Sequence, residues 1–283
     1  MALGAPATDL EQAAEQRARK TLTRCLDLDA ATAAYQASRC VLFRRELVLH
    51  DYLAINLAPA ALNQILDAIE VVGLEHAGGR AGGTILLSLH YSLYSNWLGL
   101  WLARATARGL FSHLDIIVLS TPAGSLRLSQ RRTADLGRAG IWDDRTRLVD
   151  RRLTGNAVAA RTLLDRLRAG GAVMVLPDAS LLPAAGRRTI AVLVGRQYVG
   201  LPRGPAWLVR LSGAHVVPVH IRPCSDDHHS IVFGSPARPG PEADADTFMQ
   251  AIVQRLLDQT VAADPAPWEG WFRDGLRAQV AMT

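Results

Sequence analysis

The pattern of hydrophobic and polar positions changes character near residue 70. From Leu10 to about Ile69, apolar residues recur at helical spacing, and Pro59 opens a further turn or helix. This part predicts two or three helices. Short apolar runs of strand length follow, and several are apolar on both faces, as central strands of a covered sheet are. These runs are VVGLEH, GTILLSLH, LDIIVLS, AVMVLP, IAVLVG, HVVPVHI and HSIVFG.

Helical stretches separate the apolar runs. We expect them at residues 97–108, 124–138, 156–169, 204–212 and 247–262. The sequences RAGG and RLSG close two of them with the glycine that commonly ends a helix. Strands alternating with helices predict an α/β sandwich, with a central, mostly parallel or mixed sheet flanked by helices and an N-terminal helical extension. We expect one structural unit, with a helical segment at 1–70 packed on an α/β domain at 71–283.

Composition sets broad limits on the class of protein. The chain has 283 residues, of which 49% are hydrophobic and 20% charged, as in an ordinary globular protein with a large core. Its three cysteines lie far apart without CxxC spacing, so we expect neither a zinc site nor disulfides. No HxH or HExxH pattern accompanies the histidines His215, His220, His228 and His229, so no metal is expected. The first twenty residues do not resemble a signal peptide, and we expect a cytoplasmic location.

The positive charge carries little information about partners. The net charge is +5, but nearly all the cations are arginines and Lys20 is the single lysine. No helix-turn-helix, RNP or zinc-finger signature is present, so we expect no nucleic-acid partner. Residues 127–152 hold eight arginines against four aspartates. This stretch is either a solvated helix and loop, or a positive surface for an acidic carrier protein, coenzyme A phosphates or an anionic lipid head group.

The chemistry centres on LSLHYSLYSNWLGLWL, residues 87–102, which lies in an uncharged run between Arg80 and Arg104. A membrane span, a buried core histidine and a catalytic base all compete to explain His90. Serines, an asparagine and tyrosines around this histidine would be costly in a bilayer. A strand, a turn and a helix fit better, and they place His90 at the carboxyl end of a strand, facing a helix N-terminus. Ligands bind at that position in α/β sheets, and the helix N-terminus stabilises negative charge.

Four blocks in order resemble the LpxL/HtrB-like lysophospholipid acyltransferases of lipid A and phosphatidylinositol mannoside synthesis. They are SLHYSLYSNWLGLWLA, LLDRLRAGGAVMVLPDAS, GLPRGPAWLVRLSGAHVVPVHIRP and PAPWEGWFRD, and the likeness spans roughly residues 35–275. The family's first motif is a histidine, four residues, then Asp or Glu. It implies a histidine base whose orientation the acid fixes. Here His90 is present, but Ser95 stands in place of the acid.

The missing acid leaves three interpretations open. The acceptor is a better nucleophile than a sugar hydroxyl, or a carboxylate from elsewhere replaces the acid, or the site binds a thioester without turning it over. Ser95 would be a weak orienting partner, and Asp178 is the first carboxylate to test as a replacement. A serine nucleophile at Ser92 or Ser95 is disfavoured because no GxSxG elbow presents it.

The resemblance also implies further site residues. Asp178 matches an LPDQ-like acid, although Ala179 replaces the glutamine, and it either shapes the site with an arginine or caps a turn. Gly204 matches a Gly-Pro helix start, which also has a purely structural explanation. Further substrate contacts are expected at Ser92, Tyr94, Asn96, Arg132 (or Arg131) and Arg203. Backbone amides of residues 92–96 would stabilise an oxyanion.

The leading functional hypothesis is a soluble acyltransferase, because the family's membrane enzymes carry an N-terminal anchor and we expect none in this chain. It would move an acyl or aminoacyl group from a phosphopantetheine thioester, on an acyl or peptidyl carrier protein or on coenzyme A, to a small-molecule amine or hydroxyl. We expect this thioester to be a substrate and no cofactor to be bound. One alternative is a peripheral membrane lipid acyltransferase that uses Trp97, Trp101 and the arginines. Another is a non-catalytic binder of acylated carrier protein, and thioester hydrolysis also stays open.

Overall fold

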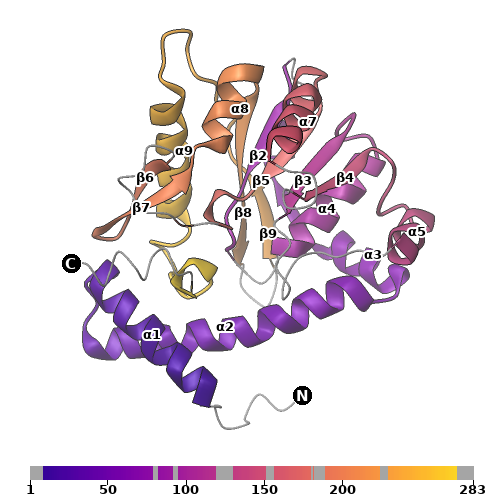
Figure 1. Cartoon of the computed structure of the whole chain (residues 1–283). Helices are drawn as coiled ribbons and strands as arrows, with labels where there is room; N and C mark the ends of the chain where they lie inside the picture. The colour runs from indigo at the N-terminus through magenta and orange to yellow at the C-terminus, as the bar shows by residue number, and fades with distance from the viewer. Residues whose placement is uncertain are drawn as a thin grey trace.

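A mostly parallel sheet forms the centre of the molecule (Figure 1). The computed structural model describes residues 9–78, 82–91, 95–118, 130–150, 156–179, 181, 189–223 and 229–272. Within these residues the main sheet has seven strands in the order β1-β9-β8-β2-β5-β3-β4. Every neighbouring pair is parallel except β8 and β9. The strands are β1 (Glu70–Val72), β2 (Thr84–Leu87), β3 (Leu114–Val118), β4 (Thr146–Asp150), β5 (Ala172–Val175), β8 (His215–Pro223) and β9 (His229–Phe233). The predicted α/β class is confirmed.

Helices cover both faces of this sheet. The described helices are α1 (Asp9–Leu26), α2 (Ala30–Asn56), α3 (Pro59–Ala68), α4 (Ser95–Ala107), α5 (Gln130–Arg138), α7 (Asn156–Arg168), α8 (Gly204–Ser212) and α9 (Ala245–Gln259), and all but the first two pack beside the sheet. Short 3-10 turns occur at η1 (Leu74–His76), η2 (Pro177–Ala179) and η3 (Glu269–Phe272). A hairpin of β6 (Thr189–Val194) and β7 (Gln197–Pro202) packs against α9. Among the described helices, none has both the length and the apolarity to cross a membrane.

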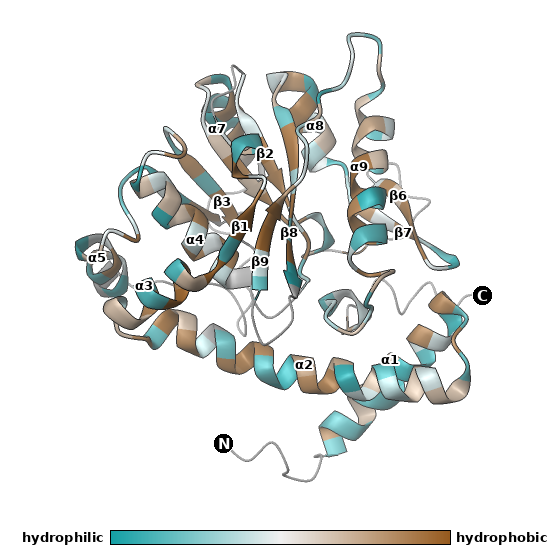
Figure 2. Ribbon diagram, turned by 180° about the vertical axis from the view of Figure 1, so that it is seen from behind, coloured by the Kyte–Doolittle hydropathy of each residue, from teal (hydrophilic) through white to brown (hydrophobic). Residues whose placement is uncertain are grey.

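The two helical layers explain why the central strands are apolar without alternation. In β2, Ile85 and Leu87 join a core with α7, α8 and α9, whereas Leu86 joins a second core with α3 and α4 on the other face. All four residues of β2 and all four of β5 are buried. Figure 2 shows this as hydrophobic strands at the centre and hydrophilic residues on the outer sides of the helices. A sheet covered on both sides needs apolar side chains in both directions.

The first two helices lie across the lower edge of the α/β unit rather than on a face of the sheet (Figure 1). Small side chains such as Ala14, Ala18 and Ala37 are buried in this region, so the helices can approach closely. Glu11 pairs with Arg45 across this contact. Asp29 caps α2 by accepting hydrogen bonds from the backbone amides of Ala31 and Thr32.

The sequence pattern predicts most elements but misses two strands. The helix at 204–212 is confirmed at both ends, and the N-terminal region has three helices, with Pro59 opening the third. The predicted run VVGLEH is strand only over Glu70–Val72 and continues as a 3-10 turn. The missed β7 is the second half of a hairpin, and the missed β4 lies in the arginine-rich stretch. On β4, Arg147 is exposed and pairs with the buried Asp115 of β3. The charged residues of this edge strand make its sequence look unlike a strand.

Gly83, at the start of β2, provides a stability test of the fold. Its φ is +76°, and a Cβ there would lie 2.3 Å from the carbonyl oxygen of Leu167. Gly109 has a similar φ of +95° with open space around it. We expect Gly83→Ala to lower the free energy of unfolding by about 3 kcal/mol, since a backbone clash adds to the left-handed strain. Gly109→Ala should cost about 1 kcal/mol from strain alone. Urea titration of both variants measures this, and equal losses would contradict the predicted clash.

Candidate active site

Two residues that are far apart in sequence meet because two parallel strands are neighbours in register. Leu87, the last residue of β2, is the register partner of Val175, the last residue of β5. The pairing continues one residue further, where the Ser88 amide donates to the carbonyl of Val175. His90 follows Leu87 by three residues, and Asp178 follows Val175 by three. The equal offset brings both side chains to the same place at the carboxyl edge of the sheet.

The side chains of His90 and Asp178 form a hydrogen-bonded pair. The imidazole Nδ1 lies 2.9 Å from Oδ1 of Asp178. The backbone amide of His90 also donates to both carboxylate oxygens, at 3.1 Å to Oδ1 and 2.9 Å to Oδ2. The carboxylate is 1% exposed, whereas the imidazole is 24% exposed. Since a carboxylate accepts its hydrogen bond, Nδ1 carries the proton, and a reaction at this histidine would use Nε2.

The surroundings keep Asp178 ionised despite its burial. Burial acts to raise the pKa of this carboxyl. The attraction of His90 and the hydrogen bonds donated by His90 and Trp268 outweigh that effect and lower the pKa below its ordinary value. An ionised carboxylate on Nδ1 both fixes the tautomer of the histidine and stabilises an imidazolium.

The carboxy-terminal segment closes the site from below. Trp268 is 1% exposed, and its indole Nε1 donates to Oδ2 of Asp178 at 2.8 Å. The backbone of Trp268 bridges to Tyr91, and the amide of Glu269 donates to the carbonyl of His90 at 3.1 Å. The sequence block PAPWEGWFRD contains Trp268 and Glu269, but the sequence assigned a role to neither of them. A tryptophan in a polar-apolar loop was the available signal, because a buried indole N–H needs an acceptor.

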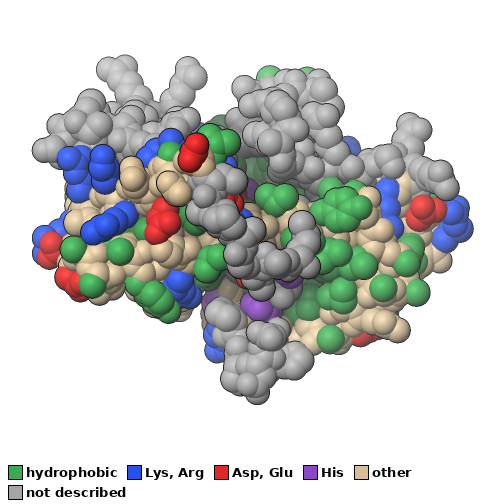
Figure 3. Space-filling view, turned by 90° about the horizontal axis from the view of Figure 1, so that it is seen from below, with side chains coloured by type: hydrophobic (Ala, Val, Ile, Leu, Met, Phe, Trp, Pro, Cys, Tyr) green, Lys and Arg blue, Asp and Glu red, His purple; other side chains and the backbone are tan. Residues whose placement is uncertain are grey.

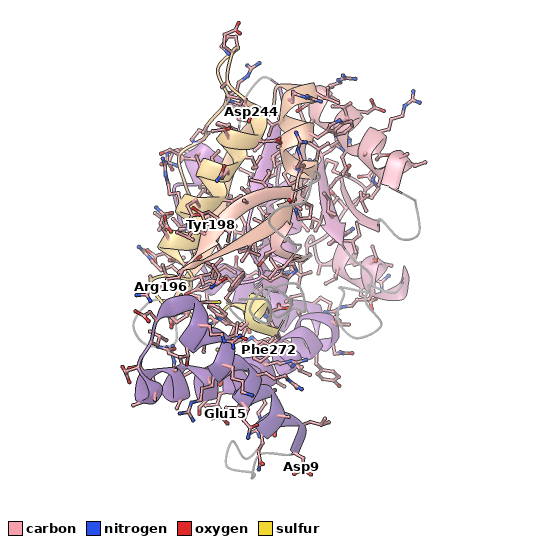
Figure 4. All side chains as sticks on the ribbon, turned by 60° about the vertical axis from the view of Figure 1, so that its left-hand side comes forward. Asp9, Glu15, Arg196, Tyr198, Asp244 and Phe272 are labelled. Carbon is pink, nitrogen blue, oxygen red and sulfur yellow. The ribbon has the colours of Figure 1, made fainter. Side chains whose placement is uncertain are left out.

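The N-terminal helices hold that segment in place. Arg39 of α2 donates two hydrogen bonds to the carboxylate of Asp264, at 2.7 and 2.8 Å. The hydroxyl of Tyr91 donates to the carbonyl of the same residue at 3.0 Å. Further along, the guanidinium of Arg44 lies 5.0 Å from the ring centre of Phe272. Figure 4 labels Phe272 where η3 meets the N-terminal helices. The site therefore lies between the carboxyl edge of the sheet and α2.

The remaining predicted site residues are placed differently. Ser92 and Tyr94 lie outside the described residues, and Ser95 and Asn96 form the start of α4, where the side chains are not described. The helix start that the sequence predicts after His90 is confirmed, and its first-turn amides supply the positive end of a helix dipole. Whether these residues contact a substrate stays a prediction.

Three further candidates occupy α5 and α8. Arg132 is half-buried on α5 and donates to the carbonyl of Ala54, near the end of α2, at 3.4 Å. Arg203 forms an ion pair with Asp246 in the first turn of α9. Gly204 begins α8 and is exposed, with open space where a Cβ would stand. Their substrate-binding roles stay predictions. Within the described part of the chain, no cluster of three or more His, Cys, Asp or Glu side chains is arranged to hold a metal.

The fold and the pair define a class of protein: an α/β sandwich with a half-exposed histidine on a buried aspartate at the carboxyl edge of its sheet. Residues 141–277 match the model of the family described as bacterial lipid A biosynthesis acyltransferase. This match supports the assignment to the LpxL/HtrB-like acyltransferases that the sequence motifs indicated. The matched segment contains Asp178 and Trp268 and begins after His90.

Comparisons with individual proteins add little. No curated protein matches the chain at a significant level. Among solved structures, the crystal structure of the 1-acyl-sn-glycerophosphate (LPA) acyltransferase PlsC from Thermotoga maritima is similar at 16% identity and a TM-score of 0.41. The likeness covers 84% of this chain and 86% of that one. At this score it is too distant to carry an inference.

Replacing Asp178 tests the pair as a structural unit. Asp178→Ala leaves the His90 amide, the His90 ring and the Trp268 indole without their acceptor in a buried place. We expect a loss of about 3 kcal/mol in the free energy of unfolding. Asp178→Asn keeps one oxygen as an acceptor and should cost less than half as much. Urea titration at pH 7 distinguishes the two variants, and an Asp178→Ala protein as stable as the wild type would contradict this arrangement.

Proposed function

We propose that the protein is an acyltransferase in which His90 is the general base and Asp178 its orienting carboxylate. The observation that carries the proposal is the 2.9 Å contact between Nδ1 of His90 and Oδ1 of Asp178. The family match over residues 141–277 supports acyl transfer as the reaction type. Ionised Asp178 would let His90 take up a proton and hold it during the reaction.

The proposed reaction needs only these groups and a thioester donor. Nε2 of His90 accepts the proton of an acceptor hydroxyl while the hydroxyl oxygen attacks the thioester carbonyl. The resulting oxyanion faces the positive N-terminal end of α4. Collapse of the intermediate breaks the carbon–sulfur bond, and the imidazolium returns its proton to the departing thiolate. The products are an acylated acceptor and a free thiol.

The Ser95 departure fits the second of the three interpretations. The carboxylate that contacts Nδ1 of His90 belongs to the turn after another strand, β5, so the pair does not require an acid at position 95. With that carboxylate in place, neither an unusually strong nucleophile nor a non-catalytic site is needed to explain the serine. The donor remains our expectation of a phosphopantetheine thioester, on a carrier protein or on coenzyme A, and a cytoplasmic location remains part of the proposal.

For the acceptor we favour a membrane lipid over a soluble small molecule. The family description concerns lipid A synthesis, and the face below the site is suited to a bilayer surface.

This face exposes apolar side chains of α2. After Arg45, α2 extends past the described part of α1, and Val48, Leu49 and Tyr52 are 67%, 43% and 63% exposed. Figure 3 shows hydrophobic side chains gathered to the right of the centre of this face, with Lys and Arg side chains on the left and at the right edge. Arg17, Arg19 and Lys20 of α1 are exposed. Apolar contacts flanked by cations bind anionic bilayers.

Removal of the proposed base tests the reaction. We expect His90→Ala to lower the rate of acyl transfer about a thousandfold, because the variant loses the group proposed to take the acceptor proton. The assay is intact-mass spectrometry of acyl carrier proteins and acyl-coenzyme A, with lysophospholipid, amine and thiol acceptors. His113→Ala, at an exposed histidine before β3, is the matched control and should leave the rate unchanged. A His90→Ala enzyme as active as the wild type would refute the role of His90.

Vesicle flotation tests the lipid acceptor. We expect the wild type to bind phosphatidylglycerol vesicles more strongly than phosphatidylcholine vesicles, and binding should weaken as salt is added. Val48→Asp should lower the partition coefficient about tenfold, since it removes one inserted aliphatic side chain. Val158→Asp is the matched control, because Val158 is 61% exposed on α7, away from this face. Equal loss in the two variants would exclude α2 as the membrane-facing helix.

A further inference from the structure

Three N–H groups hold the carboxylate of Asp178, and one of them does not belong to the histidine. The ring of His90 bonds Oδ1, and the backbone amide of His90 bridges Oδ1 and Oδ2. The third donor is the indole N–H of Trp268, which bonds Oδ2 at 2.8 Å. Rotation of the carboxylate that would turn Oδ1 away from the imidazole must also break the bond from the indole. The orientation of the pair therefore depends on where the indole stands.

The segment around Trp268 is shaped to place that indole. Its backbone is fixed by the bridge to Tyr91, and its ring makes an edge contact with Trp271 at 5.0 Å and 84°. Gly270 lies against the six-membered ring of Trp268, where a Cβ would approach Cε2 and Cζ2 to 2.3 Å. Only a residue without a side chain at position 270 allows this approach. The sequence Trp-Glu-Gly-Trp is thus matched to one position of the Trp268 ring.

We propose that Trp268 is a positioning residue of the His90–Asp178 pair: its indole N–H locks the carboxylate so that Oδ1 stays on Nδ1 of His90. The proposal rests on the proposed function, in which His90 acts as the base. The indole also takes up part of the negative charge on Asp178. Without it, the carboxylate would turn more freely and would hold a proton on the histidine more strongly.

Trp271 supplies a matched control. Its ring is also fully buried and touches Trp268, but its indole N–H donates to the carbonyl of Pro265 and not to the pair. Trp268→Phe and Trp271→Phe each remove one indole N–H and keep an aromatic ring. A purely structural role predicts the same loss for both variants. A positioning role predicts a specific loss for Trp268→Phe.

The kinetic test separates these outcomes. We expect Trp268→Phe to lower kcat for acyl transfer about tenfold with KM nearly unchanged. The acidic limb of its pH–rate profile should move to higher pH, since the histidine then keeps its proton more strongly. Trp271→Phe keeps the aromatic ring beside Trp268 and removes no bond to Asp178, so it should lower kcat by less than about twofold and leave the limb in place. Equal kcat values and superimposable pH profiles for the two variants would overturn the proposal.

A second measurement needs neither a tryptophan variant nor activity. In the ¹⁵N-labelled wild type, the indole N–H resonance of Trp268 should shift with the same midpoint as the ring of His90, because both bond one carboxylate. The indole of Trp271 should not follow this titration, and His90→Ala should abolish it for Trp268. A Trp268 resonance that ignores the titration of His90 would overturn the inference even if Trp268→Phe fails to fold. Co-titration without acyl transfer would refute the proposed function alone, and transfer without co-titration would refute the role of Trp268 alone.

Discussion

The parallel pairing of β2 with β5 is the constraint on which the site depends. Because Leu87 and Val175 are register partners, the residues three positions beyond each of them lie together at the carboxyl edge of the sheet. A shift of one residue in that register would separate His90 from Asp178 and turn the apolar side chains of β2 toward the wrong layers. The buried side chains on both faces of these two strands hold the register, so the two cores and the histidine–aspartate pair are stabilised by the same packing.

The rest of the chain completes what this register begins. The indole N–H of Trp268 donates to Oδ2 of Asp178, and the amide of Glu269 donates to the carbonyl of His90. Arg39 of α2 clamps Asp264 in the same segment. The N-terminal helices thus act on the site through the carboxy-terminal segment, and the two ends of the chain are coupled where the proposed chemistry occurs. If α2 faces a bilayer as proposed, its other side lies next to the segment that holds the pair.

The proposed pair differs from the family motif in where its carboxylate comes from. A carboxylate five residues after the histidine would reach Nδ1 from the same turn and helix, through local backbone geometry. Here the carboxylate lies in the turn after β5, the neighbour of β2 in the sheet, so its contact with Nδ1 depends on the pairing of these two strands. The physical requirement is an ionised acceptor on Nδ1, and burial with three N–H donors meets it for Asp178. The proposed pair therefore does not need an acidic residue at position 95.

The sequence alone determined what depends on local pattern. Period and length of the apolar runs predicted the α/β class and most helices, Gly204 and Gly213 bounded α8, and the resemblance of four blocks led to the family and to His90. It missed β4, whose arginine-rich edge position does not look like a strand. It could not choose Asp178 over Ser95 as the partner of His90, although it named both. That choice depends on the order of strands in the sheet, which places β5 beside β2 although some eighty residues separate them in the chain. Hydrogen bonds between strands so far apart produce no periodic pattern in the sequence from which their pairing could be predicted.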